Sequence, residues 1–215
     1  PTQPIPRDAV CWRGLDWGFA EPYANYWMFL DQESDIHIAR ELYGYGGAAN
    51  VGTREGADVV RDKILDIERI HQINCPEGYL DGSTKDQQNA GTTIYDALGG
   101  LAMNWKPWPK YAGSRISNKQ MFHTLLKVVN GKSRIKIHDN CRHLIRTLPA
   151  LPTAKNNPED VDTHAEDHGY DAVVGAISAK KLPTKQERFH SDLIMQMNRR
   201  EGIRQISRLP SVGGW

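Results

Sequence analysis

Acidic residues at three distant points of this 215-residue chain have the types best suited to chemistry. Asp16 and Asp81 each close a short apolar run, and Asp171 lies near the start of a later apolar segment. Carboxylate oxygens are preferred ligands of Mg²⁺ and Mn²⁺, and two such ions could clamp the attacking and leaving oxygens of a phosphodiester. Residue order does not prove that the three acids meet. If they meet without a metal, they repel one another and raise their own pKa values.

The two strand-associated acids each have a second interpretation. Asp16 lies between Gly14 and Gly18, and Asp81 precedes Gly82, an arrangement that also occurs where a strand ends in a turn. An acid buried in a strand is destabilising unless a partner neutralises it. Turn chemistry and metal ligation therefore both stay open for these positions.

The third acid belongs to a dense polar group at the predicted start of a helix that becomes apolar from Ala172. Asp167 and Asp171 are one helical turn apart, and His168 lies three residues before Asp171 on a neighbouring face. Four acids and two histidines fall between positions 162 and 171. They either complement the helix dipole or, as their number favours, form a site for a hard cation.

The elements that must position these acids follow from hydrophobic periodicity. Alternating and aromatic-rich segments predict a meander of three strands, over 9–17, 23–31 and 35–43. Apolar residues at helical spacing predict a helix over 53–73 that is capped by Thr53. A strand over 78–81 follows this crossover, so Asp81 stands at a strand's carboxyl end, where open α/β sheets hold their sites.

Later segments are predicted to alternate between helices and weaker structure. Helices are predicted over 87–99, over 140–151, and over 117–129 with Ser117 as its cap. Residues 103–110 predict a strand broken by prolines, which is typical of a sheet edge. Residues 152–162 predict a polar loop, and 182–215 a peripheral helix followed by a mobile tail.

The most basic region of the chain, 106–146, also has two interpretations. The net charge of +1 excludes a global field for nucleic acid, so any such surface must be a local patch. The basic residues form either a solvated face or contacts for a phosphate backbone. The candidates for DNA contact are Lys110, Arg115, Lys119, Lys132, Arg134 and Lys136. The Gly/Tyr run at 43–47 is either a loop or a stacking surface for nucleic acid.

Composition and length limit the classes of protein to which the chain can belong. With 39% hydrophobic and 25% charged residues, the chain suits one globular core. Three scattered cysteines fit no disulfide framework and favour a reducing interior. The sequence has no signal peptide or membrane-spanning run, so neither secretion nor membrane association is expected. Because the first residue is Pro, we expect a piece of a larger protein: a linker remnant at 1–8, one domain at 9–181, and a C-terminal helix and tail at 182–215.

Four runs resemble, in this order, the C-terminal nuclease domain of tailed-phage terminase large subunits: Gly14–Gly18, Glu41–Gly47, Leu80–Ser83 and Glu166–Ala172. The resemblance covers residues 9–180. It implies an α/β fold of the RNase H-like type, with a central mixed sheet of antiparallel strands 1–3 and then parallel strands, flanked by helices. It also implies a metal-dependent endonuclease that cuts concatemeric double-stranded viral DNA in the host cytoplasm, using two Mg²⁺ or Mn²⁺ ions.

The same resemblance implies a set of partners. These are double-stranded DNA, an ATPase domain in the parent protein, the portal and the small terminase subunit. The chain itself contains no G-x-x-x-x-G-K-[ST] motif, so we expect it to cut DNA but not to translocate it.

Carried over residue by residue, the resemblance assigns catalysis and metal ligation to the same acids. The first-strand aspartate falls on Asp16, where it would bridge two ions, and the second-strand acid falls on Asp81. The late-helix acid falls on Asp171, preceded by the histidine of a His-x-x-Asp pattern at His168. His168 would orient or protonate a reacting group, or only support Asp171. Asp167 is an additional carboxylate for a second ion or only for a water.

Two other functions compete with this one. Another RNase H-like nuclease, such as a junction resolvase or a transposase-type enzyme, would use similar acids. The run at 41–47 and the missing recombinase-specific elements disfavour it. A non-catalytic module that clamps DNA or docks on the portal would retain the acids without binding metal.

Overall fold

The computed structural model describes residues 4–86, 88–89, 91–154, 157–162, 164–180 and 182. The chain divides into two compact units, Pro1–Lys181 and Leu182–Trp215. The helix and tail predicted for 182–215 lie outside the described residues, apart from Leu182. Within the described part of the chain, no helix has both the length and the apolar character needed to cross a bilayer.

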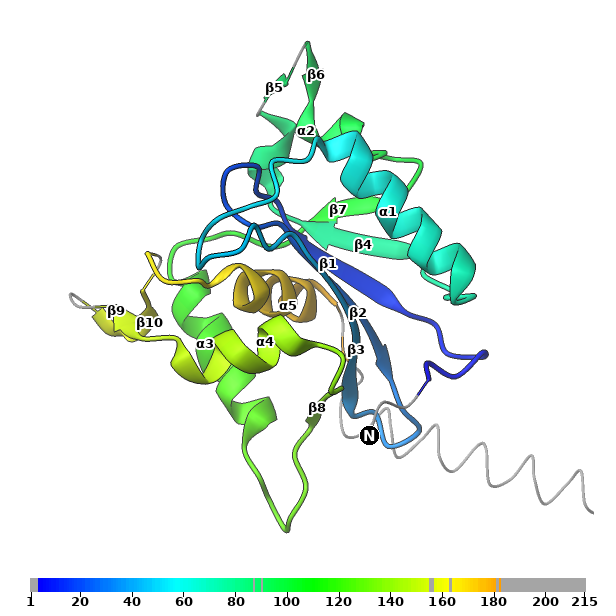
Figure 1. Cartoon of the computed structure of the whole chain (residues 1–215). Coiled ribbons are helices and arrows are strands. Elements are labelled where there is room, and N and C mark those ends of the chain that lie inside the picture. Colours follow the sequence, from blue (N-terminus) through cyan, green and yellow to red (C-terminus); the bar gives the residue numbers. More distant parts are fainter. Residues whose placement is uncertain are drawn as a thin grey trace, which may run out of the picture. The chain divides into compact units, whose positions relative to one another are not determined.

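A six-stranded mixed sheet forms the centre of the first unit, in the order β7-β4-β1-β2-β3-β8 (Figure 1). Its strands are β1 (Trp12–Asp16), β2 (Ala24–Leu30), β3 (Ile36–Tyr43), β4 (Glu77–Leu80), β7 (Trp105–Pro107) and β8 (Ile135–Ile137). β1, β2 and β3 are antiparallel neighbours, β4 and β7 continue parallel to β1, and β8 runs parallel to β3. The predicted mixed sheet is confirmed, and β7 lies at its edge as its proline indicated.

Helices cover both faces of the sheet, so its central strands are buried. Helix α1 (Ala57–Ile70) lies on one face, and α3 (Ser114–Leu126), α4 (Arg142–Thr147) and α5 (His168–Ala179) lie on the other (Figure 1). Arg13 of β1 is only 2% exposed; its guanidinium donates to Glu68 of α1 at 2.7 Å and lies over the ring of Trp105. This buried ion pair fastens α1 to the strand that carries Asp16.

Helix α5 reaches the sheet most closely at Gly14. A Cβ added there would lie 2.3 Å from the Ala172 carbonyl oxygen and 2.6 Å from Ala176 Cβ, so the close approach requires glycine. Side chains alternate along a strand, and Asp16 therefore faces α5 as Gly14 does. This backbone contact sets the first turn of α5 beside the end of β1.

Two helices begin at residues other than those predicted. α1 begins directly after Gly56, which supplies no side-chain cap, so the predicted cap at Thr53 is wrong. α3 begins directly after Gly113, and its predicted cap at Ser117 is also wrong. Gly113 has a left-handed φ of +82°, a conformation that glycine adopts without strain, and it turns the chain into the helix earlier than a polar cap would indicate.

The predicted helix over 87–99 is mostly replaced by a small hairpin. Strands β5 (Gln88–Asn89) and β6 (Thr92–Thr93) pair with each other, and only the single turn α2 (Ile94–Ala97) is helical. Strands this short contain too few alternations for periodicity to reveal them.

The segment predicted as a polar loop, 152–162, also contains a hairpin. Its strands are β9 (Thr153–Ala154) and β10 (Asn157–Val161). Directly before this hairpin, α4 continues into the 3₁₀ turn η2 (Leu148–Ala150), which lies within the helix predicted over 140–151. Another 3₁₀ turn, η1 (Gly82–Lys85), follows β4.

Replacing Gly14 by alanine tests the contact between β1 and α5. The added methyl group cannot fit without moving the helix backbone, so we expect the free energy of unfolding to fall by about 1–3 kcal/mol. Urea denaturation followed by circular dichroism measures this change. Gly82→Ala is the matched control, since its Cβ would meet only Pro107, at 3.6 Å. Equal stability of the wild type and Gly14→Ala would mean that α5 does not pack this closely on β1.

Candidate metal centre

The carboxyl ends of β1 and β4 bring two of the predicted acids to one edge of the sheet. The strands are parallel neighbours, and Leu15 lies opposite Leu80. Asp16 and Asp81 each follow one residue later, so they lie side by side where the two strands end. Asp81 Oδ1 accepts from the Ser83 backbone N–H at 2.9 Å and caps η1. Asp81 therefore does serve turn chemistry with one oxygen, while its Oδ2 lines the cleft described below.

The start of α5 supplies the other acids. Asp167 is the N-cap residue, and His168 and Asp171 lie in the first turn. His168 Nδ1 is hydrogen-bonded to Asp16 Oδ2 at 3.0 Å. The histidine therefore holds Asp16 by a hydrogen bond, and its charge also favours ionisation of Asp171.

Glu166 anchors the chain just before α5. It accepts from the Tyr43 hydroxyl at 2.9 Å and from both terminal nitrogens of Arg146, at 2.8 and 2.6 Å. Tyr43 ends β3 and lies at the same end of the sheet as Asp16, and Arg146 belongs to α4. This carboxylate thus joins three elements and fixes the position from which α5 begins.

Burial and mutual repulsion raise the pKa values of the clustered acids. Burial raises the pKa of Asp167 to about 7, with repulsion from Asp171 as the next cause. Burial raises the pKa of Asp171 to about 6, with repulsion from Asp16 as the next cause. Burial also raises the pKa of Asp16, and Asp81 adds to the shift, while the hydrogen bond from His168 opposes it. The Asp16 carboxyl is therefore near enough to Asp81 and to Asp171 for repulsion to act between them, and Asp81 and Asp171 line one pocket.

Positive side chains of the protein accompany these acids. Burial disfavours the charged form of His168, but its hydrogen bond to Asp16 raises its pKa overall. Burial opposes ionisation of Asp81, but pairing with the Lys110 ammonium lowers its pKa overall. Asp81 thus has a local cation, and Asp16 has a histidine whose protonated form it favours.

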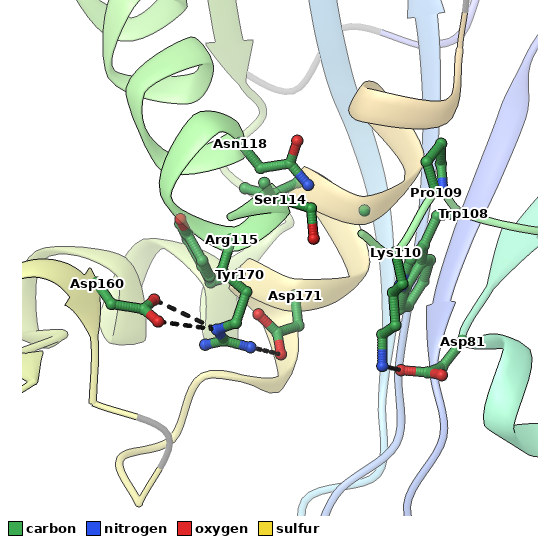
Figure 2. A pocket seen from close by; sticks show the side chains of 12 residues that line it. Asp81, Trp108, Pro109, Lys110, Ser114, Arg115, Asn118, Asp160, Tyr170 and Asp171 are labelled. Atoms are coloured by element: carbon green, nitrogen blue, oxygen red, sulfur yellow. Dashed lines mark hydrogen bonds and ion pairs between the residues drawn. The ribbon is translucent and has the colours of Figure 1, made fainter. Parts of the chain in front are cut away.

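Arg115, in the first turn of α3, contacts acids from two other elements (Figure 2). Its Nη1 lies 3.3 Å from Asp171 Oδ2, and its Nη2 lies 3.8 Å from Asp167 Oδ2. Its Nε lies 3.2 Å from Asp160 Oδ1 of β10. The sequence analysis missed Asp160, because it lies in a segment predicted as a loop and no local pattern connects it to the other acids.

The chemistry of these side chains fits a hard divalent cation. Asp16, Asp81 and Asp171 offer only oxygen atoms, and the Nε2 atom of His168 is buried with no hydrogen-bond partner in the described part of the chain. Among the described residues, no group of three His, Cys, Asp or Glu side chains is arranged to hold an ion, and Asp81 and Asp171 are paired with basic side chains of the protein.

The six basic residues predicted to contact DNA do not form one surface. Lys110 and Arg115 line the cleft between the acids of β4 and α5 (Figure 2). Lys119 is only 9% exposed, and its Nζ donates to the Asp160 carbonyl at 3.0 Å, so it fastens β10 to α3.

The other three basic residues lie at the opposite end of the sheet. β8 pairs with the start of β3, where Ile36 is opposite Ile135, whereas Asp16 adjoins the end of β3 through β2. Each of these three basic residues forms an ion pair with an acid in the turn between β2 and β3. The pairs are Lys132 with Glu33, Arg134 with Asp35 and Lys136 with Asp31. These pairings favour the solvated-face interpretation for this half of the basic region.

Neither a protein-family model nor a curated protein sequence matches this chain. Solved structures that share its fold include the large terminase of a thermophilic bacteriophage, with a TM-score of 0.61 at 15% identity. The P22 large terminase nuclease domain gives a TM-score of 0.56 at 13% identity. The large terminase nuclease of a second thermophilic phage, G20c, with bound cobalt gives 0.53 at 14% identity.

These likenesses confirm the predicted RNase H-like fold, which is that of large terminase nuclease domains. The match to the first large terminase covers 81% of this chain, and the chain spans 40% of the length of that protein. The P22 match covers 82% of this chain and 84% of that nuclease domain, and the G20c match covers 83% and 86%. In extent, the chain therefore corresponds to the nuclease domain of such proteins.

The raised pKa values predict how the metal-free protein responds to pH. A carboxyl whose folded-state pKa is above its unfolded value binds more protons when folded, so stability falls as pH rises between the two values. For Asp167 and Asp171 this interval runs from 3.8 to about 7 and about 6, respectively. His168, whose pKa is also raised, loses its contribution as pH rises through its folded-state pKa. In chelator, we therefore expect the melting temperature to fall between about pH 5 and pH 8.

Differential scanning calorimetry measures this pH dependence. Mn²⁺ should offset the loss most strongly at about pH 8, where the carboxylates are ionised. A melting temperature in chelator that rises over the same range would contradict the clustering of these acids.

Proposed function

We propose that this chain is the nuclease domain of a large terminase and hydrolyses phosphodiester bonds of double-stranded viral DNA during genome packaging. The observation that supports the proposal is the placement of Asp16 and Asp81 at the carboxyl ends of paired strands, with Asp16 hydrogen-bonded to the first turn of α5, which also carries Asp171. Solved large terminase nucleases share this fold, and that of phage G20c has cobalt bound. Oxygen ligands of this kind suit Mg²⁺ or Mn²⁺.

The converging acids would hold the metal ions, two in this proposal. Asp16, which interacts with both other acids, would be the central ligand, together with Asp81 and Asp171. Asp167 adds a carboxylate for the second ion or for its water. Bound ions would supply an activated water near neutral pH and stabilise the charge that develops on the phosphate. His168 acts as a positioning residue, because its Nδ1 fixes the orientation of Asp16.

The proposal extends to the setting in which the domain acts. The first of the similar large terminases, of which this chain spans 40%, has also been solved in complex with ADP and with ATP-gamma-S. By analogy, we propose an ATPase domain in the parent protein, with DNA, the portal and the small terminase subunit as partners in the host cytoplasm.

Asp16→Asn tests the role of the central acid. Asparagine keeps the size of the side chain but removes the charge that a shared ligand needs, so we expect metal-dependent cleavage to fall below detection while the fold persists. Nicking of supercoiled plasmid in Mn²⁺, Mg²⁺ or chelator measures this. Asp66→Asn is the matched control, since Asp66 is exposed on α1 and pairs there with Arg69. It should cut like the wild type.

Three results would contradict the proposal in different ways. If the Asp16→Asn variant still cleaves DNA, Asp16 is not part of the catalytic site. A wild-type chain that binds no Mn²⁺ in calorimetry would favour the non-catalytic DNA-clamping or portal-docking module. A preference for four-way junctions over linear duplex would favour a resolvase.

His168→Ala tests the positioning of Asp16. Loss of a residue that orients a metal ligand typically lowers metal affinity or activity about 10–100-fold, and we expect a loss of that size here. Calorimetric titration with Mn²⁺ and plasmid cleavage measure the two effects. His123→Ala on the exposed face of α3 is the control and should match the wild type. Unchanged Mn²⁺ affinity in His168→Ala would mean that the histidine does not organise the site.

A further inference from the structure

Two of the converging acids are paired with long, positively charged side chains, Asp81 with Lys110 and Asp171 with Arg115. We propose that these two basic residues are exchangeable counter-ions. They neutralise the carboxylates before metal binds, and they contact the DNA backbone after metal ions displace them. The inference rests on the proposed nuclease function of the same site.

Lys110 is suited to leave its partner with little loss of stability. It lies in the segment that follows the edge strand β7, and its side chain is 62% exposed while it pairs with Asp81 Oδ2. An ion pair with one solvent-exposed partner contributes little to stability, and a divalent ion brings twice the charge to the same oxygens. The metal ion therefore displaces the ammonium group, which stays beside the cleft on its flexible stem.

Arg115 has a second anchor that metal binding leaves intact. Its Nε lies 3.2 and 3.3 Å from the two carboxylate oxygens of Asp160, which is not among the proposed ligands. Its Nη1 meets Asp171 only at 3.3 Å, and its Nη2 is buried, makes no hydrogen bond within the described part of the chain and lies 3.8 Å from Asp167 Oδ2. The guanidinium can therefore release Asp171 while Asp160 keeps it in the cleft, and its Nη1 is then available to a phosphate.

The two basic side chains line two pockets that share residues. Asp81 and Asp171 both line one pocket, and Figure 2 shows Lys110 pointing to Asp81 and Arg115 pointing to Asp171. The other pocket adds Tyr111, which is 61% exposed. A DNA backbone bound in these pockets would therefore lie beside both cations. Their positive charge balances the carboxylates before metal binds, and balances the phosphate afterwards.

Calorimetric titration with Mn²⁺ in the absence of DNA tests the first step. Lys110→Met removes the competing charge but keeps an apolar stem, so we expect Mn²⁺ to bind about two- to five-fold more tightly than to the wild type. Lys132→Met is the matched control, because Lys132 pairs with Glu33 at the far end of the sheet, and its Mn²⁺ affinity should equal that of the wild type. Unchanged or weaker binding by Lys110→Met would overturn the exchange.

Binding of a short DNA duplex with Ca²⁺ as the metal probe tests the second step. Lys110→Met and Arg115→Met should each bind the duplex more weakly than Lys132→Met does, and the slope of log affinity against log salt should fall by about 1 for each. Tighter Mn²⁺ binding together with weaker DNA binding is the expected signature of Lys110→Met, because a purely structural lysine would not change the two in opposite directions. DNA affinity equal to that of the control would overturn the backbone contact.

The failure of this inference is distinguishable from failure of the proposed function. A wild-type chain that takes up no Mn²⁺ overturns both. Uptake by the wild type, with equal uptake by Lys110→Met, overturns the exchange alone and leaves the nuclease proposal intact.

Discussion

Like charges gathered at one edge of a sheet must be compensated by positive charge, and the organisation of this molecule depends on that constraint. The parallel pairing of β1 and β4 delivers Asp16 and Asp81 to the same edge, and the start of α5 adds Asp171. Partial burial strengthens the repulsion among them, because less water screens the charges. The compensating cations come from three different elements: α5, the segment after β7, and α3. Folding therefore brings together acids and bases that are distant in the sequence.

Local patterns were sufficient to predict the frame that carries the acids. The strands that lead to Asp16 and Asp81 were predictable because each is an apolar run bounded by glycine, and the helix between them has a clear period. Helix starts were less predictable. At Gly113 the chain turns by a left-handed backbone conformation, and at Gly56 no side chain caps the helix, so polar capping residues gave the wrong boundaries.

Local sequence patterns could not predict the contacts between segments that are distant in the sequence. Arg115 and Asp160 are 45 residues apart, and only the packing of β10 on α3 joins them. The basic region 106–146 is continuous in sequence, yet β8 takes half of it to the far end of the sheet, where it pairs with the start of β3. Nearness in sequence therefore did not predict one continuous basic surface, and the acids of the turn between β2 and β3 gave no local sign that they would pair with half of these residues.

The contact of α5 with Gly14 has a consequence for ion size. Because the helix backbone touches the strand there, the spacing between Asp16 and Asp171 is set by main-chain packing and leaves little room for adjustment. Asp81 leaves the sheet beside Asp16 and stands at the start of a short 3₁₀ turn. Adjustment to cations of different radius would therefore depend more on residues 82–85 than on α5.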